Sequence, residues 1–126
     1  MSTTDWEIIK YFDPDNTYCA CGCGQGPEEM KPRTMLMLDL ARKQAGIPFV
    51  LTSAFRCPQH NEDVGGAENS AHKKGYGVDI ECKDSRSRFV IIDALLRVGF
   101  TRIGIAETFI HADNDPDNTP QVAWVY

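Results

Sequence analysis

Short β-branched segments near the end of the chain define its architecture. Residues 102–106, 109–113 and 122–126 each have the length and composition of a strand, and only a dipeptide and the turn-rich stretch 114–120 separate them. Upstream, two longer segments have the pattern of amphipathic helices. Long helices combined with short adjacent strands predict an α+β fold, a mainly antiparallel sheet with helices packed on it.

The first helix is predicted over residues 32–45. Pro32 suits its first turn, and Gly46 follows at the place where a left-handed residue ends a helix. Its apolar stripe is predicted to consist of Leu36, Met37, Leu40 and Ala41.

The second helix is predicted to start where Asp84 or Ser85 caps it and to end before Gly99. Its spacing of apolar residues is typical of a helix that buries one face. The residues of that face are predicted to be Phe89, Ile92, Leu95 and Leu96.

The rest of the chain divides into an arm and a core. Residues 1–26 are predicted to form an irregular N-terminal arm with one short helix around Trp6 to Tyr11, and residues 27–126 the core of a single domain. The remaining core elements are a buried strand over 47–55, a short helix over 58–63, a loop over 65–74 and a strand over 76–82.

Composition and charge exclude several classes of protein. The 126 residues are 42% hydrophobic and 25% charged, which is ordinary for a globular domain and unlike a disordered chain. The net charge is −5 and no basic face is evident, so we expect no binding to nucleic acid. No stretch is long and apolar enough to span a membrane, and no signal peptide is recognisable, so we expect cytoplasmic synthesis and no membrane partner.

Five cysteines occur in a chain for which we expect reduced thiols. Cys19, Cys21 and Cys23 alternate with small residues, and we interpret this run as a tight Gly-rich turn. The alternative is that the three thiolates bind zinc, although such sites normally use a C-x2-C spacing.

Two histidines lie in settings that indicate a metal site. His72 precedes the predicted strand that carries Asp79, and Gly75 and Gly77 between them permit a sharp return of the chain. His111 on a separate strand would complete a His-Asp-His set. Three protein ligands with one position left for water are typical of catalytic zinc.

The motif S-x-H-x-x-G-x-G-x-D over residues 70–79, followed by F-I-H-x-D over 109–113, resembles the M15 zinc peptidases. That family includes D-alanyl-D-alanine carboxypeptidases and phage endopeptidases of peptidoglycan. Further similarity covers T-S-A-F-R-C-P over residues 52–58, V-G-G over 64–66 and the closing W-V-Y over 124–126. The resemblance implies one zinc ion in a cleft on the sheet of a single α+β domain, a fold shared with hedgehog-like signalling proteins.

The resemblance also implies roles for individual residues. His72, Asp79 and His111 correspond to the zinc ligands, and Arg56 to the group that steadies substrate or the developing oxyanion.

Two positions depart from the family pattern. Gly77 replaces the usual alanine, and Thr108 stands where several members have the acidic general base. Glu107, one residue away, and Asp113, two residues after the last zinc ligand, are therefore alternative candidates for the base. Asp113 can instead orient a ligand imidazole.

The function expected from this resemblance is zinc-dependent hydrolysis of an amide bond in a peptidoglycan stem peptide. We expect a monomeric, endolysin-type hydrolase of a phage or prophage that reaches the wall through a holin-type release or as a virion component. Two alternatives remain: a non-catalytic zinc-containing binding or virion structural protein of the same fold, and a cytoplasmic D-Ala-D-Ala dipeptidase.

Overall fold

The computed structural model describes residues 3–126 and contains one five-stranded sheet. In the order β1-β2-β4-β3-β5, every pair of neighbours is antiparallel except β3 and β5, which are parallel. The strands are β1 (Leu51–Ser53), β2 (Gly77–Glu81), β3 (Arg102–Ile105), β4 (Phe109–Asp113) and β5 (Val122–Val125). The α+β, mainly antiparallel prediction is confirmed.

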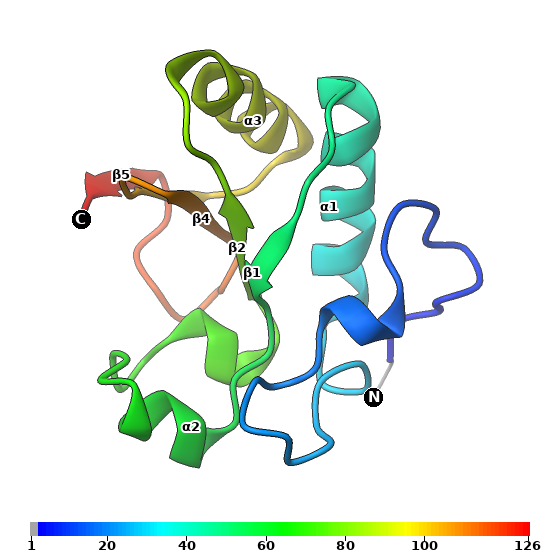
Figure 1. Cartoon of the computed structure of the whole chain (residues 1–126), viewed down its shortest axis with the longest axis vertical. Coiled ribbons are helices and arrows are strands. Elements are labelled where there is room, and N and C mark those ends of the chain that lie inside the picture. Colours follow the sequence, from blue (N-terminus) through cyan, green and yellow to red (C-terminus); the bar gives the residue numbers. More distant parts are fainter. Residues whose placement is uncertain (1–2) are drawn as a thin grey trace.

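Two long helices cover one face of this sheet (Figure 1). They are α1 (Pro32–Ala45) and α3 (Ser85–Val98), which pack against each other. Asp84 caps α3 by accepting a hydrogen bond from the Ser87 N–H at 2.8 Å, and Gly99 ends it in a left-handed conformation with φ 106°. The helix boundaries therefore follow the capping residues predicted from the sequence.

The core lies between these helices and the inner face of the sheet. Because side chains alternate along a strand, Val78 and Ile80 of β2 and Ile110 and Ala112 of β4 point into the core. Their neighbours in the sequence point to the opposite face, where the polar residues of the sheet gather. The inner face thus packs in the core and stabilises the domain, and the outer face can hold a functional site.

The predicted apolar stripes of both helices are partly wrong. Leu36 and Leu40 of α1 are each 46% exposed, whereas Met35 and Leu38 are fully buried. Met37 and Ala41 of the predicted stripe are buried, so half of it is confirmed. The other half is wrong because α1 carries apolar residues around most of its surface, so that packing against α3 selects the buried face.

The α3 stripe fails in the same way. Phe89 is 74% and Leu96 is 55% exposed, while Ile91, Ala94 and Leu95 are buried. Only Leu95 of the predicted stripe lies fully within the core, and Ile92 packs at its edge.

Three shorter elements also differ from the prediction. The strand expected over 47–55 is only Leu51–Ser53, and its pairing with β2 is irregular. The loop expected over 65–74 contains a 3-10 helix, η2 (Ala71–Lys74). The short helix over 58–63 is confirmed as α2 (Pro58–Asp63).

The N-terminal arm contains no helix between Trp6 and Tyr11. That segment is a turn, and the helical element of the arm is η1 (Pro14–Asn16). The carboxylate of Asp39 on α1 accepts hydrogen bonds from the backbone N–H groups of Lys10 and Tyr11 at 3.0 and 2.7 Å. These bonds attach the arm to α1 and leave its backbone without the bonds of a helix.

None of the helices formed by residues 3–126 is long and apolar enough to cross a membrane.

Candidate active site

Three buried side chains meet on the outer face of the sheet. They are His72 from η2, Asp79 from β2 and His111 from β4. One carboxylate oxygen, Asp79 Oδ1, lies 2.8 Å from His111 Nδ1 and 3.2 Å from His72 Nε2. Their potential ligand atoms all lie within 4.8 Å of one another, so the three residues can bind one metal ion.

Sheet register accounts for this convergence. Asp79 and His111 are direct cross-strand partners, and His111 is in turn paired with Gly104 on β3. Gly104 is paired with Trp124 on β5, so one row of residues crosses four strands on the same face. Because Gly104 has no side chain, the Trp124 indole lies over it, with its ring centre 5.6 Å from that of His111.

The turn before β2 places the remaining histidine. Ser70 accepts a hydrogen bond from the His72 N–H, and Gly75 ends η2 with φ 80°, a conformation that glycine adopts without strain. A Cβ atom at Gly77 would lie 3.2 Å from the His111 ring and 3.1 Å from Ala71 Cβ. Glycine at 77 therefore allows η2 and β4 to approach each other closely.

Both imidazoles are held by a second partner on the far side of the ring. His72 Nδ1 lies 2.7 Å from the carbonyl oxygen of Ala54, and His111 Nε2 lies 2.6 Å from Asp113 Oδ2. These outer bonds fix the two rings with His72 Nε2 and His111 Nδ1 facing Asp79. An outer acceptor on each ring is the arrangement that orients histidine ligands in metal sites.

The next row of the sheet supports this arrangement. Asp113 is the cross-strand partner of Arg102, and Arg102 Nε donates to Asp113 Oδ1 at 3.1 Å. The Asp113 carboxylate also accepts a bond from the Asp115 N–H. Asp113 is only 1% exposed, and these contacts engage its carboxylate fully. The His111 ring lies between this carboxylate and the point where His72, Asp79 and His111 meet.

Electrostatics in this cluster favour the charged carboxylate. Burial alone would raise the pKa of Asp79, but its hydrogen bonds to His111 and His72 outweigh burial and hold the pKa far below its usual range. Burial lowers the pKa of His111, yet its bonds to Asp113 and Asp79 raise it overall. The Asp79 carboxylate therefore stays charged at the point where a cation would bind.

A pocket opens above the three residues. Arg56 lies on its wall, and Phe109, Trp124 and Tyr126 supply an aromatic surface. Arg56 is held in place because its Nη1 donates to Asn61 Oδ1 at 2.9 Å and its backbone N–H donates to the His72 carbonyl oxygen at 3.1 Å. The guanidinium and the three buried residues thus share one cavity.

The sequence of residues 10–113 matches the family described as Peptidase M15. The chain belongs to the M15 peptidase family. Among curated proteins, no sequence matches the chain. Membership of the M15 family implies a metallopeptidase, and the His72, Asp79 and His111 group is its candidate zinc site.

Five of the six residues singled out from the sequence line the pocket of this M15 peptidase: Arg56, His72, Asp79, His111 and Asp113. The sixth, Glu107, is exposed in the turn between β3 and β4 and is not part of the pocket lining. Its backbone carbonyl accepts a bond from Arg88 on α3, on the helix side of the turn.

Several pocket residues were not singled out from the sequence. Trp124 and Tyr126 belong to the closing W-V-Y segment, which carried part of the M15 resemblance but was given no role. Arg102 also lines the pocket, with its guanidinium 5.1 Å from the centre of the Trp124 ring. Its role depends on the β3–β4 register, for which the sequence contains no local signal.

Proposed function

We propose that the protein is a zinc-dependent peptidase that hydrolyses an amide bond in peptidoglycan stem peptides. The observation that carries the proposal is the convergence of His72 Nε2, Asp79 Oδ1 and His111 Nδ1 in a pocket that also contains Arg56. A peptide substrate with a free carboxylate or a carbonyl near Arg56 fits this arrangement.

The three converging residues suit zinc. Two imidazole nitrogens and one carboxylate oxygen are a ligand set of catalytic zinc in peptidases, and a fourth position is left for water or substrate. When bound, zinc polarises a carbonyl oxygen and lowers the pKa of a water molecule to near ~7. The outer bonds from His72 to Ala54 and from His111 to Asp113 keep the ligand nitrogens directed toward the ion.

Arg56 stabilises the negative charge that develops on the carbonyl oxygen of the scissile bond. Its planar fork keeps its charge and can grip a carbonyl or carboxylate oxygen. Asn61 fixes the guanidinium before substrate arrives, so little reorganisation is needed when the charge develops. The aromatic residues Phe109, Trp124 and Tyr126 pack against the substrate on the other side.

Asp113 acts through His111. Its carboxylate is engaged by His111, Arg102 and the Asp115 N–H, which makes it a positioning residue for the metal ligand. Burial raises the pKa of Tyr126, so its phenol stays protonated and can donate a hydrogen bond to the substrate. Few of the pocket-lining side chains are available to donate a proton to the leaving amine.

The proposal places the protein at the bacterial cell wall. We infer that it acts as a monomeric, endolysin-type hydrolase of a phage or prophage, after holin-type release or as a virion component. Peptidoglycan stem peptides are its proposed partner because their D-amino acid carboxylates complement Arg56.

One observation favours a second candidate function, that of a non-catalytic zinc-containing binding or virion structural protein. Among the pocket-lining residues within 3–126, the carboxylates are those of Asp79 and Asp113, and both are already engaged. Thr108, at the position of the acid in several family members, is exposed. A site of this kind can bind a peptide with its aromatic wall and Arg56 and still turn it over slowly or not at all.

The test is mass spectrometry of the soluble products released from purified peptidoglycan by zinc-loaded protein. We expect new fragments that disappear with a chelator and with His111→Ala, and their masses identify the bond that is cut. Free D-Ala-D-Ala serves as a parallel substrate, and its cleavage without release from walls would favour the dipeptidase. Binding to sacculi with neither activity would favour the binding protein.

A further inference from the structure

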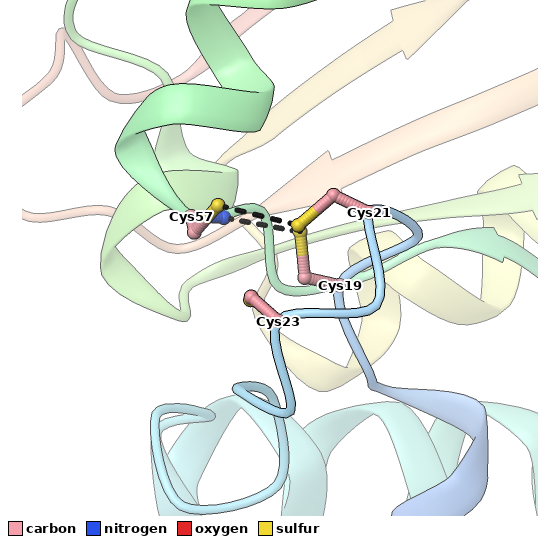
Figure 2. A group of neighbouring side chains, drawn as sticks. All are labelled: Cys19, Cys21, Cys23 and Cys57. Atoms are coloured by element: carbon pink, nitrogen blue, oxygen red, sulfur yellow. Dashed lines mark hydrogen bonds between the residues drawn. The ribbon is translucent and has the colours of Figure 1, made fainter.

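Four cysteines from two distant segments meet beside α2. Cys19, Cys21 and Cys23 come from the N-terminal arm, and Cys57 is the residue immediately before α2. Figure 2 shows the three arm cysteines beside Cys57. We call these four residues the cysteine cluster. The sequence interpretation of a simple Gly-rich turn is incomplete, because it did not include the fourth cysteine.

The sulfur atoms are spaced as ligands of one ion. Cys19 Sγ lies 3.4 Å from Cys21 Sγ, and Cys21 Sγ lies 3.6 Å from Cys57 Sγ. All four sulfurs lie within 4.8 Å of one another, and the cysteines are free thiols. Zinc–sulfur bonds of about 2.3 Å in a tetrahedron place sulfurs about 3.8 Å apart. The observed spacing is close to this value and far longer than the roughly 2.05 Å of a disulfide bond.

Backbone turns explain how such closely spaced cysteines converge. Gly22 and Gly24 have φ values of 82° and 85°, so the chain reverses between the cysteines at positions where glycine is unstrained. The Cys19 N–H donates to the Gln25 carbonyl oxygen at 2.8 Å and closes the turn at its base. The C-x-C spacing, which argued against a metal on sequence grounds, is compensated by these glycines.

The two buried sulfurs also accept backbone hydrogen bonds. The Cys57 N–H lies 3.4 Å from Cys19 Sγ, and the His60 N–H lies 3.4 Å from Cys57 Sγ. Such bonds hold the two sulfur atoms in place, as outer partners do for metal ligands. The fifth cysteine, Cys82, is buried outside the cluster next to Asp84.

We propose that the cysteine cluster binds a structural zinc ion, in addition to the ion proposed for the His72, Asp79 and His111 group. Four thiolates close the coordination sphere, which is the pattern of a structural site with no open position. Binding releases the four thiol protons to solvent and forms four zinc–sulfur bonds, without any change in oxidation state.

The position of the ion defines its role. It links the arm to the turn between β1 and α2, and Cys57 in that turn is adjacent to Arg56. The arm is otherwise attached by contacts such as those of Asp39 with Lys10 and Tyr11. A zinc ion at the cluster would fix both the arm and the backbone that carries the pocket arginine. The site does not require peptidase activity and stands or falls independently of it.

The primary experiment is metal analysis of the full-length protein purified under reducing conditions. We expect roughly two zinc ions per chain in wild type, and one fewer in both the Cys21→Ser/Cys23→Ser and the His72→Ala/His111→Ala variants. Cys82→Ser is the matched control and should keep the wild-type content. Wild-type zinc content in the cysteine variant, or iron in place of zinc, would overturn the proposal.

A second pair of measurements leaves all four cysteines of the cluster intact, in case the cysteine variant fails to fold. Cys21 and Cys23 are exposed, so an alkylating reagent can reach both sulfurs when no metal is bound. As zinc ligands they should resist alkylation until a chelator is added. Cobalt substitution should also give a thiolate-to-cobalt charge-transfer band that persists in His72→Ala/His111→Ala. Immediate alkylation of the zinc-loaded protein, or absence of the band, would refute the site.

Discussion

Replacing Asp113 with asparagine tests the assignment of this residue to positioning His111. The Asp113→Asn change keeps the volume of a side chain that is 1% exposed, but it removes the charge from the 2.6 Å bond to His111 Nε2. Hydrogen bonds to charged groups contribute about 1.5–3 kcal/mol and neutral ones about 0.5–1.5. The difference of roughly 1–2 kcal/mol corresponds to about 5- to 30-fold weaker zinc binding at the His111 site.

The assay is competition for zinc against a chromophoric chelator, following the ion that His72→Ala/His111→Ala fails to bind. Asp115→Asn is the matched control, because Asp115 is equally buried but pairs with Lys74 at 2.9 Å and has no contact with His111. It should lower thermal stability through loss of that pair and leave zinc affinity unchanged. Wild-type zinc affinity in Asp113→Asn, with a folded protein, would refute the positioning role.

Four further predictions address the pocket, the turn beside it and the core. The Arg56→Lys variant should still bind zinc, but its rate of amide hydrolysis should fall about 100-fold, because a point charge replaces the planar guanidinium. An unchanged rate would contradict the role of Arg56. Glu107→Gln should hydrolyse substrate within about twofold of wild type, since Glu107 lies outside the pocket, and a loss of about 100-fold would restore it as the base. In chemical denaturation, Leu38→Ala should lower the free energy of unfolding by about 2–5 kcal/mol, because Leu38 is fully buried. Leu40→Ala should lower it by less than about 0.5 kcal/mol, because Leu40 is 46% exposed. Equal effects of the two changes would refute the packing described for α1. Zinc affinity measured by titration should fall as pH drops below the raised pKa of His111, because the ion must displace the Nδ1 proton, and a pH-independent affinity would contradict this. In the zinc-free protein, the stability contributed by the contacts of His111 with Asp113 and Asp79 should be lost as pH rises through the same pKa, and a melting temperature that does not fall over that range would contradict it.

The features predicted best from the sequence are those set by local chemistry. The ends of α3 follow from Asp84 and Gly99, because a capping side chain and a left-handed glycine act within a few residues of their position. The convergence of His72 with Asp79 is likewise local, because Gly75 and Gly77 are built into the turn that joins them.

The features that the sequence did not predict depend on packing between distant segments. The buried face of α1 contains Leu38 and not Leu40 because α3 packs there, and no residue within α1 records that choice. Cys57 joins the arm cysteines only after α2 has been placed beside the arm. Glu107 and Asp113 are equivalent candidates for the base in the sequence, and only the strand register shows that Asp113 lies against His111 while Glu107 lies in the exposed turn.

The row that crosses the sheet at Gly104 has a consequence for how the protein can vary. A Cβ atom at this position would lie 2.8 Å from the Trp124 indole, so any other residue would push the indole away from His111. Gly104 has no functional group and touches no proposed substrate, yet a mutational scan should find it as intolerant to change as a metal ligand. Glycine is required at position 104 because the Trp124 indole lies directly over its backbone. A sequence with a larger residue at this position would therefore have to replace Trp124 as well.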